Sequence, residues 1–162
     1  MKQLLTSFAQ YEHWANERLF QVISPLTEEQ QQQEIVSSFS SVHKTCLHIW
    51  DATAIWWQRV HKVKEIVVPS LSFHPTMQEI EDGLLQQNKQ WIDWVRSATD
   101  ADISYVLPYK NMKGEAFEQE VKEILLHVNN HGSYHRGQLV TMLRQLEVEK
   151  IPQTDYILYA RS

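Results

Sequence analysis

The segment from about Glu120 to Leu146 constrains the fold most, because it combines a long helical period with three regularly spaced histidines. Its apolar residues recur one turn apart, as in an amphipathic helix: Val121, Leu125, Val128, Leu139, Met142 and Leu146. His127, His131 and His135 follow one another at intervals of four residues. This spacing stacks side chains on one face of a helix, where two imidazoles can hold one metal ion.

The three histidines do not all face the apolar side. With an advance of about 100° per residue, His135 falls near the centre of the apolar sector and His131 on its shoulder. His127 lies roughly 100° from the centre, close to the polar boundary. Burying a polar ring costs on the order of 1–3 kcal/mol unless it is paired. One inward histidine is usually a hydrogen-bonded core residue, whereas two in one stack predict a shared metal ion.

Three other segments show the same helical period. The first covers residues 2–23, the second runs from Ser40 or Ser41 to about His61, and the third runs from Thr76 to about Ala98. The second segment is apolar nearly all round and is predicted to be the most buried helix. Thr76 and Glu79 form a capping box that begins the third. Four long amphipathic helices predict an all-α four-helix bundle, with residues 1–162 as a single domain.

The connections carry weaker signals. Residues 26–39 are rich in Gln and Glu and predict a solvated connector with one short helical turn. Residues 62–74 have no clear period and predict an ordered loop. A small hairpin is predicted over 102–118, where Ile103–Leu107 alternates weakly and a turn-like stretch, Asn111–Gly114, follows.

A candidate third ligand, His48, lies in the most apolar helix, although a core or edge histidine is an equally good interpretation. Asp51 could accept a hydrogen bond from the distal ring nitrogen of a ligand, or it could be an ordinary exposed acid. Cys46 lies on a different face from His48 and is interpreted as a buried, inert thiol. The remaining histidines lack a partner at ligand spacing: His13, His43, His61 and His74.

Composition excludes several classes of function. The net charge is −5 and no basic run occurs, which argues against a nucleic-acid surface. The apolar runs are far shorter than the roughly 18 residues of a membrane span. The single cysteine excludes an internal disulfide, and the N-terminus lacks the apolar block of a signal peptide. We therefore expect a cytoplasmic protein with neither a nucleic-acid nor a membrane partner.

Four segments spread over nearly the whole chain match one known pattern. Tyr11–Leu19 contains aromatic-x-x-Trp-Ala-Asn, and His48–Asp51 reads His-x-x-Asp. Asn130–Gln138 reads Asn-His-x-x-x-His-Arg-Gly-Gln, the most specific of the four, and Pro152–Tyr156 reads Pro-x-x-Asp-aromatic. In these features the chain resembles the DinB/YfiT-like superfamily of bacterial four-helix-bundle proteins.

The resemblance implies an up-up-down-down bundle, a homodimer and one divalent metal ion held by three histidines. The implied ligands are His48, His131 and His135, with His127 as a reserve ligand or a group that supports one. Zn²⁺ and Ni²⁺ both accept imidazole readily, so either is expected as the cofactor. Trp14 and Phe20 of the first helix suit either a dimer interface or the core.

Three functions are compatible with these features. Some members of the superfamily use a thiol such as bacillithiol, which implies a metal-dependent S-transferase acting on a small thiol and an electrophile, with Asp51 as the candidate catalytic residue. A metal-dependent hydrolase would use the same ligands, with Asp51 or His127 as its base. The third function is a non-catalytic dimer that the metal stabilises. Three histidine ligands leave a metal position open, which favours a catalytic role.

Overall fold

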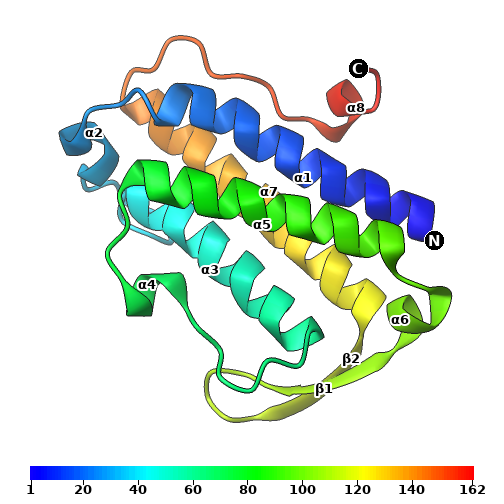
Figure 1. The fold of residues 1–162 in the computed structure, drawn as a ribbon. Coiled ribbons are helices and arrows are strands. Elements are labelled where there is room, and N and C mark those ends of the chain that lie inside the picture. The colour runs from blue at the N-terminus through cyan, green and yellow to red at the C-terminus, as the bar shows by residue number, and fades with distance from the viewer.

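Four long helices lie side by side in the computed structural model, which describes residues 1–162 (Figure 1). They are α1 (Lys2–Ile23), α3 (Val42–Val60), α5 (Met77–Ser97) and α7 (Val121–Gln145). The short elements are α2 (Glu28–Gln32), α4 (Pro69–Ser72), α6 (Asp100–Ser104), β1 (Val106–Lys110), β2 (Ala116–Glu120) and α8 (Tyr156–Tyr159). The predicted all-α four-helix bundle is confirmed. None of the helices has the length and apolar character needed to cross a membrane.

The direction of the helices differs from the expected order. Lys2 Nζ donates to the Ala98 carbonyl at the end of α5, so α1 and α5 are antiparallel. Residues 24–41 stay at one end of the bundle, so α3 runs back from there, and 61–76 then return the chain to the same end before α5 begins (Figure 1). The order is up-down-down-up, and the expected up-up-down-down order is wrong.

Local capping signals set the starts of two long helices. Ser41 Oγ accepts from the Lys44 N–H, which satisfies one of the free donors of the first turn of α3. Thr76 and Glu79 form the predicted capping box, with each side chain accepting from the other's backbone N–H. These bonds fix where α3 and α5 begin, and thereby the height of their side chains in the bundle.

The hairpin before α7 is present but starts later than predicted. β1 and β2 pair antiparallel with Tyr109 opposite Phe117, and Gly114 turns the chain at φ +83°. Ile103 belongs to α6 and not to a strand, because Thr99 and Asp102 form a capping box that initiates a helical turn. The Thr-x-x-Asp spacing was a readable signal that the sequence interpretation missed.

Two apolar clusters fill the bundle, one toward each end. The first contains Leu19, Phe20 and Leu139, and the second contains Leu5 and Leu125. Phe20 is 3% exposed and therefore belongs to the core, so it offers no surface to a partner.

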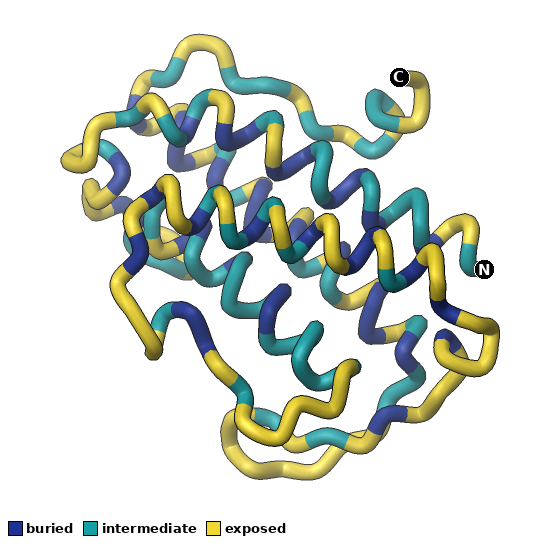
Figure 2. The backbone as a smooth tube through the Cα atoms, viewed as in Figure 1, coloured by how far each residue is buried: buried dark blue, intermediate teal, exposed yellow.

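The helix α3 is less buried than predicted. Its apolar side chains Trp50, Trp56 and Trp57 are only half-buried, and the tube in Figure 2 is correspondingly teal along much of this helix. α5 and α7 flank part of α3. Elsewhere Phe73 of the loop before α5 packs against Trp50, and Tyr109 of β1 packs against Trp56. The excess apolar surface of α3 is thus what the 61–76 segment and the hairpin partly cover.

Candidate metal centre

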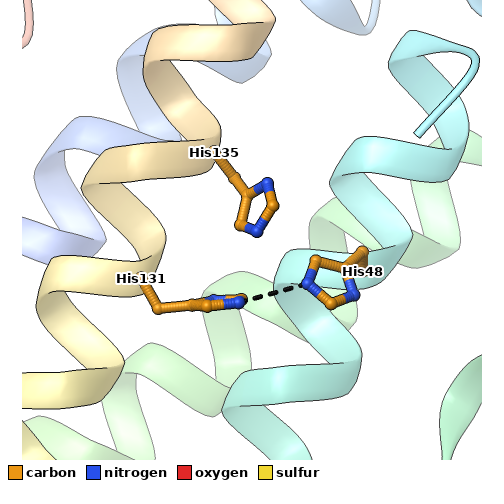
Figure 3. Close-up of side chains that lie close together, drawn as sticks. All are labelled: His48, His131 and His135. Carbon is orange, nitrogen blue, oxygen red and sulfur yellow. Dashed lines mark hydrogen bonds between the residues drawn. The ribbon is translucent and has the colours of Figure 1, made fainter. Parts of the chain in front are cut away.

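His48 of α3 and His131 and His135 of α7 converge on one point between the two helices (Figure 3). One ring nitrogen from each lies within 4.8 Å of the others. The Nε2 atoms of His48 and His131 are 3.2 Å apart. Ligands about 2.05 Å from a tetrahedral ion lie about 3.3 Å from each other, so this pair is already at ligand spacing.

The packing of α3 against α7 explains the convergence. His131 and His135 stand one helical turn apart with ring centroids 4.5 Å from each other, as the spacing of four predicts. The His48 ring lies 5.0 Å from that of His131 and 4.6 Å from that of His135. Burial along α7 follows the predicted order: His135 is buried, His131 half-buried and His127 exposed.

A glutamine orients one of the three rings. His135 Nδ1 lies 2.8 Å from Gln138 Oε1, which can only accept, so Nδ1 carries the proton. The Nε2 atom of His135 is therefore left with a free lone pair. Gln138 is itself held by a bond from its Nε2 to Ser38 Oγ at 2.7 Å. This arrangement fixes the tautomer of a candidate metal ligand, the role considered for Asp51.

The environment keeps the three rings uncharged near neutral pH. Burial, together with repulsion from His135, lowers the pKa of His48 to about 4. Burial, together with repulsion from the neighbouring histidines, His135 first, likewise lowers the pKa of His131 to about 4. Burial also lowers the pKa of His135. A neutral imidazole offers the lone pair that a metal requires, so these rings would not need to lose a proton to bind one at pH 7.

The connector after α2 covers one side of the centre. Phe39 stacks on His48 with ring centroids 4.0 Å apart and lies 5.6 Å from His135. Together with Ser38 it makes the 33–41 segment part of the site. Sequence reasoning treated this segment as solvated and missed both residues, although a lone aromatic among serines was a usable signal.

Asp51 and His127 lie outside the group of three. Asp51 Oδ1 accepts from the Ser70 N–H at 2.9 Å, which anchors α4 to α3, and no hydrogen bond joins Asp51 to His48. The His127 ring packs between Trp56 at 5.4 Å and His131 at 5.5 Å. The catalytic role of Asp51 and the supporting role of His127 stay predictions.

Cys46 is 1% exposed, and burial raises the pKa of its thiol. An inaccessible, protonated thiol is neither a nucleophile nor a ligand. The interpretation of Cys46 as a buried, inert thiol agrees with this environment.

Behind the centre, a buried ion pair joins α7 to α1. Arg136, which follows His135, is 1% exposed and donates from two nitrogens to the two carboxylate oxygens of Glu12, each at 2.6 Å. Arg136 also donates to Asn16 Oδ1 at 3.2 Å and to Ser133 Oγ at 2.9 Å. A Cβ at Gly132 would overlap the Glu12 carboxylate, so this glycine permits the close approach. The pair ties α7 to α1 beside the helical turn that carries two of the histidines.

Comparisons with known proteins agree with this architecture. The chain is 29% identical over 158 residues to the protein DinB of Bacillus subtilis (strain 168), covering 93% of this chain and 90% of that protein. It shares its fold with a DinB-like protein from Bacillus cereus, at TM-score 0.68, 21% identity and coverage of 90% and 94% of the two chains. A DinB-like protein from Bacillus subtilis matches at TM-score 0.65 and 10% identity, covering 94% of this chain and 98% of the other. The sequence model of the DinB family matches residues 1–162, and the chain therefore belongs to the DinB family.

Proposed function

We propose that His48, His131 and His135 bind one divalent metal ion, zinc or nickel, and that the protein is an S-transferase that joins a low-molecular-weight thiol to an electrophile. The observation that carries the proposal is the convergence of three uncharged imidazoles from two helices on one point. No fourth His, Cys, Asp or Glu joins the group. Three protein ligands are typical of catalytic metal sites, whereas structural sites are closed by four.

The residues of the chain contribute binding and orientation. A divalent ion held there would supply the positive charge that favours the thiolate form of a thiol. Gln138 holds the His135 ring in the tautomer that directs Nε2 inward, and Phe39 excludes water from one side by stacking on His48. Asp51, fixed by the Ser70 N–H, is the candidate for orienting the thiol or a water molecule.

Metal content is the first experiment, because the same three rings could instead form a hydrogen-bonded histidine cluster. Inductively coupled plasma mass spectrometry is applied to untagged wild-type protein, His135→Ala and His127→Ala. We expect about one ion per chain in the wild type and in His127→Ala, and none in His135→Ala. A wild-type protein that carries no metal and takes up neither Zn²⁺ nor Ni²⁺ would refute the centre.

Turnover then separates the candidate functions. The metal-loaded protein is mixed with a low-molecular-weight thiol and an electrophile, and loss of free thiol is followed with and without a chelator. Metal-dependent thiol loss, absent in His135→Ala, supports the transferase. Ester or amide hydrolysis that ignores added thiol would indicate a hydrolase. Stabilisation by metal without turnover of any thiol would indicate the non-catalytic role.

A further inference from the structure

A cavity of about 350 Å³ lies at the far end of α3, between the segment that follows this helix and β1 of the hairpin. Its lining includes the basic residues Arg59, Lys62 and Lys110 and the apolar residues Val63, Ile66 and Leu107. Arg59 lies about three helical turns, roughly 16 Å, along α3 from His48. The cavity is thus separate from the metal centre.

Three cations and no carboxylate line this cavity. The protein as a whole is acidic, with 20 acidic and 15 basic residues, so a local excess of positive charge is the opposite of its overall composition. The ion pairs of the structure involve other cations, namely Arg96, Lys122 and Arg136. Arg59, Lys62 and Lys110 therefore form no ion pair with a carboxylate of the protein.

Contacts with the hairpin hold Arg59 in place. Its guanidinium lies over the Trp56 ring at 4.6 Å and the Tyr109 ring at 5.1 Å, and Nη2 donates to the Lys110 carbonyl at 3.1 Å. That bond uses one of five N–H donors, so others remain available to a ligand. A rigid guanidinium with free donors is suited to bind a carboxylate or phosphate through two parallel bonds.

Lys62, which follows the C-cap of α3, also lines the cavity. Its φ is +55°, in the left-handed region that favours glycine or asparagine, immediately after the end of α3. Its Nζ lies 4.3 Å from the centre of the Tyr105 ring. This backbone conformation is a common way to end a helix: the Lys62 N–H donates to the Arg59 carbonyl and the Val63 N–H to the Gln58 carbonyl. The helix cap thereby places a second cationic residue in the cavity lining.

We propose that this cavity binds a small organic anion, in which a carboxylate or phosphate group pairs with Arg59 and Lys62. Its apolar body contacts the aliphatic side of the cavity, where Val63, Ile66 and Leu107 lie. A volume of about 350 Å³ is within the usual range for small-molecule sites. The binding needs no metal, so it stands or falls independently of the histidine centre.

The test is a titration of the ¹⁵N-labelled full-length protein, followed by ¹H–¹⁵N correlation spectra before and after treatment with a chelator. The probes are 3-phenylpropionate, its neutral amide and inorganic phosphate. We expect saturable shifts for 3-phenylpropionate at the amides around the cavity and at Arg59 Nε–H. The amide and phosphate are each expected to bind roughly tenfold more weakly, since each lacks one half of the recognition.

Matched variants locate the binding. Lys62→Asn removes the charge while keeping a residue that tolerates the left-handed backbone, so its fold is expected to be intact. Lys64→Gln removes one nearby charge outside the cavity lining. Binding should weaken about tenfold in Arg59→Gln, roughly threefold in Lys62→Asn and very little in Lys64→Gln. Absent shifts, equal binding of the neutral amide, or equal effects of Lys62→Asn and Lys64→Gln would each overturn the proposal.

Discussion

Removing the buried guanidinium of Arg136 is expected to be one of the most damaging single substitutions in this chain. In Arg136→Met an unbranched apolar side chain, shorter than that of arginine, replaces the guanidinium. The Glu12 carboxylate, 5% exposed, then loses both of its 2.6 Å bonds inside the bundle. Asn16 and Ser133 lose a donor as well.

The size of the effect follows from these contacts. A hydrogen bond to a charged group contributes about 1.5–3 kcal/mol, so the two bonds to Glu12 together contribute about 3–6 kcal/mol. Breaking a buried ion pair by removing one partner costs about 3–5 kcal/mol, in the same range. For a domain of this length, 1 kcal/mol corresponds to about 2–4 °C, so Tm should fall by roughly 6–20 °C.

Urea unfolding followed by circular dichroism measures the loss, with Arg144→Met as the control because Arg144 is exposed on the same helix. The control should stay within about 0.5 kcal/mol of the wild type. The double variant Glu12→Leu, Arg136→Met should recover much of the lost stability, since it leaves no unpaired buried charge. A loss below about 1 kcal/mol in Arg136→Met, or a double variant as unstable as the sum of the single variants, would refute this reasoning.

Three further predictions concern α7 and the histidines. Gly132→Ala should destabilise the folded protein by about 1–3 kcal/mol, because the new Cβ overlaps the Glu12 carboxylate. Gly137→Ala has open space around it and should stabilise the helix by about 0.5–1 kcal/mol. Urea unfolding of the two variants compares these effects. The metal-free protein should lose stability as pH falls from about 6.5 to about 4. In that range the lowered pKa values keep His48 and His131 neutral in the folded protein, whereas the same histidines of the unfolded chain take up protons. A Tm that fell with falling pH would agree with this direction, and a Tm that rose would contradict it. Gln138→Leu should weaken metal binding about 10–100-fold with Tm changed little, measured by competition with a chromophoric chelator, and unchanged affinity would contradict its orienting role.

Much of the bundle could be predicted from the order of residues, because helical periods, capping boxes and proline breaks are local signals. The first helix ends at Ile23, just before Ser24-Pro25, and α5 begins after the Thr76 cap. The relative burial of the histidines at 127, 131 and 135 was also readable, since a helix rotates side chains by a fixed angle. Local patterns did not reveal helix direction, which depends on where the connections cross the bundle.

The sequence by itself determined the pairing of His131 with His135, because a spacing of four on one helix aligns two rings whatever surrounds them. That His48 of α3 joins them was decided by the packing of the two helices. Only the tertiary structure decided what else touches those rings. Ser38 and Phe39 come from a connector with no periodic pattern, where Ser38 holds Gln138 and Phe39 stacks on His48, and Asp51 bonds to Ser70. The cationic cavity likewise joins the end of α3 to a hairpin distant in sequence. Such contacts depend on how helices and loops pack in three dimensions, which no local spacing of residues encodes.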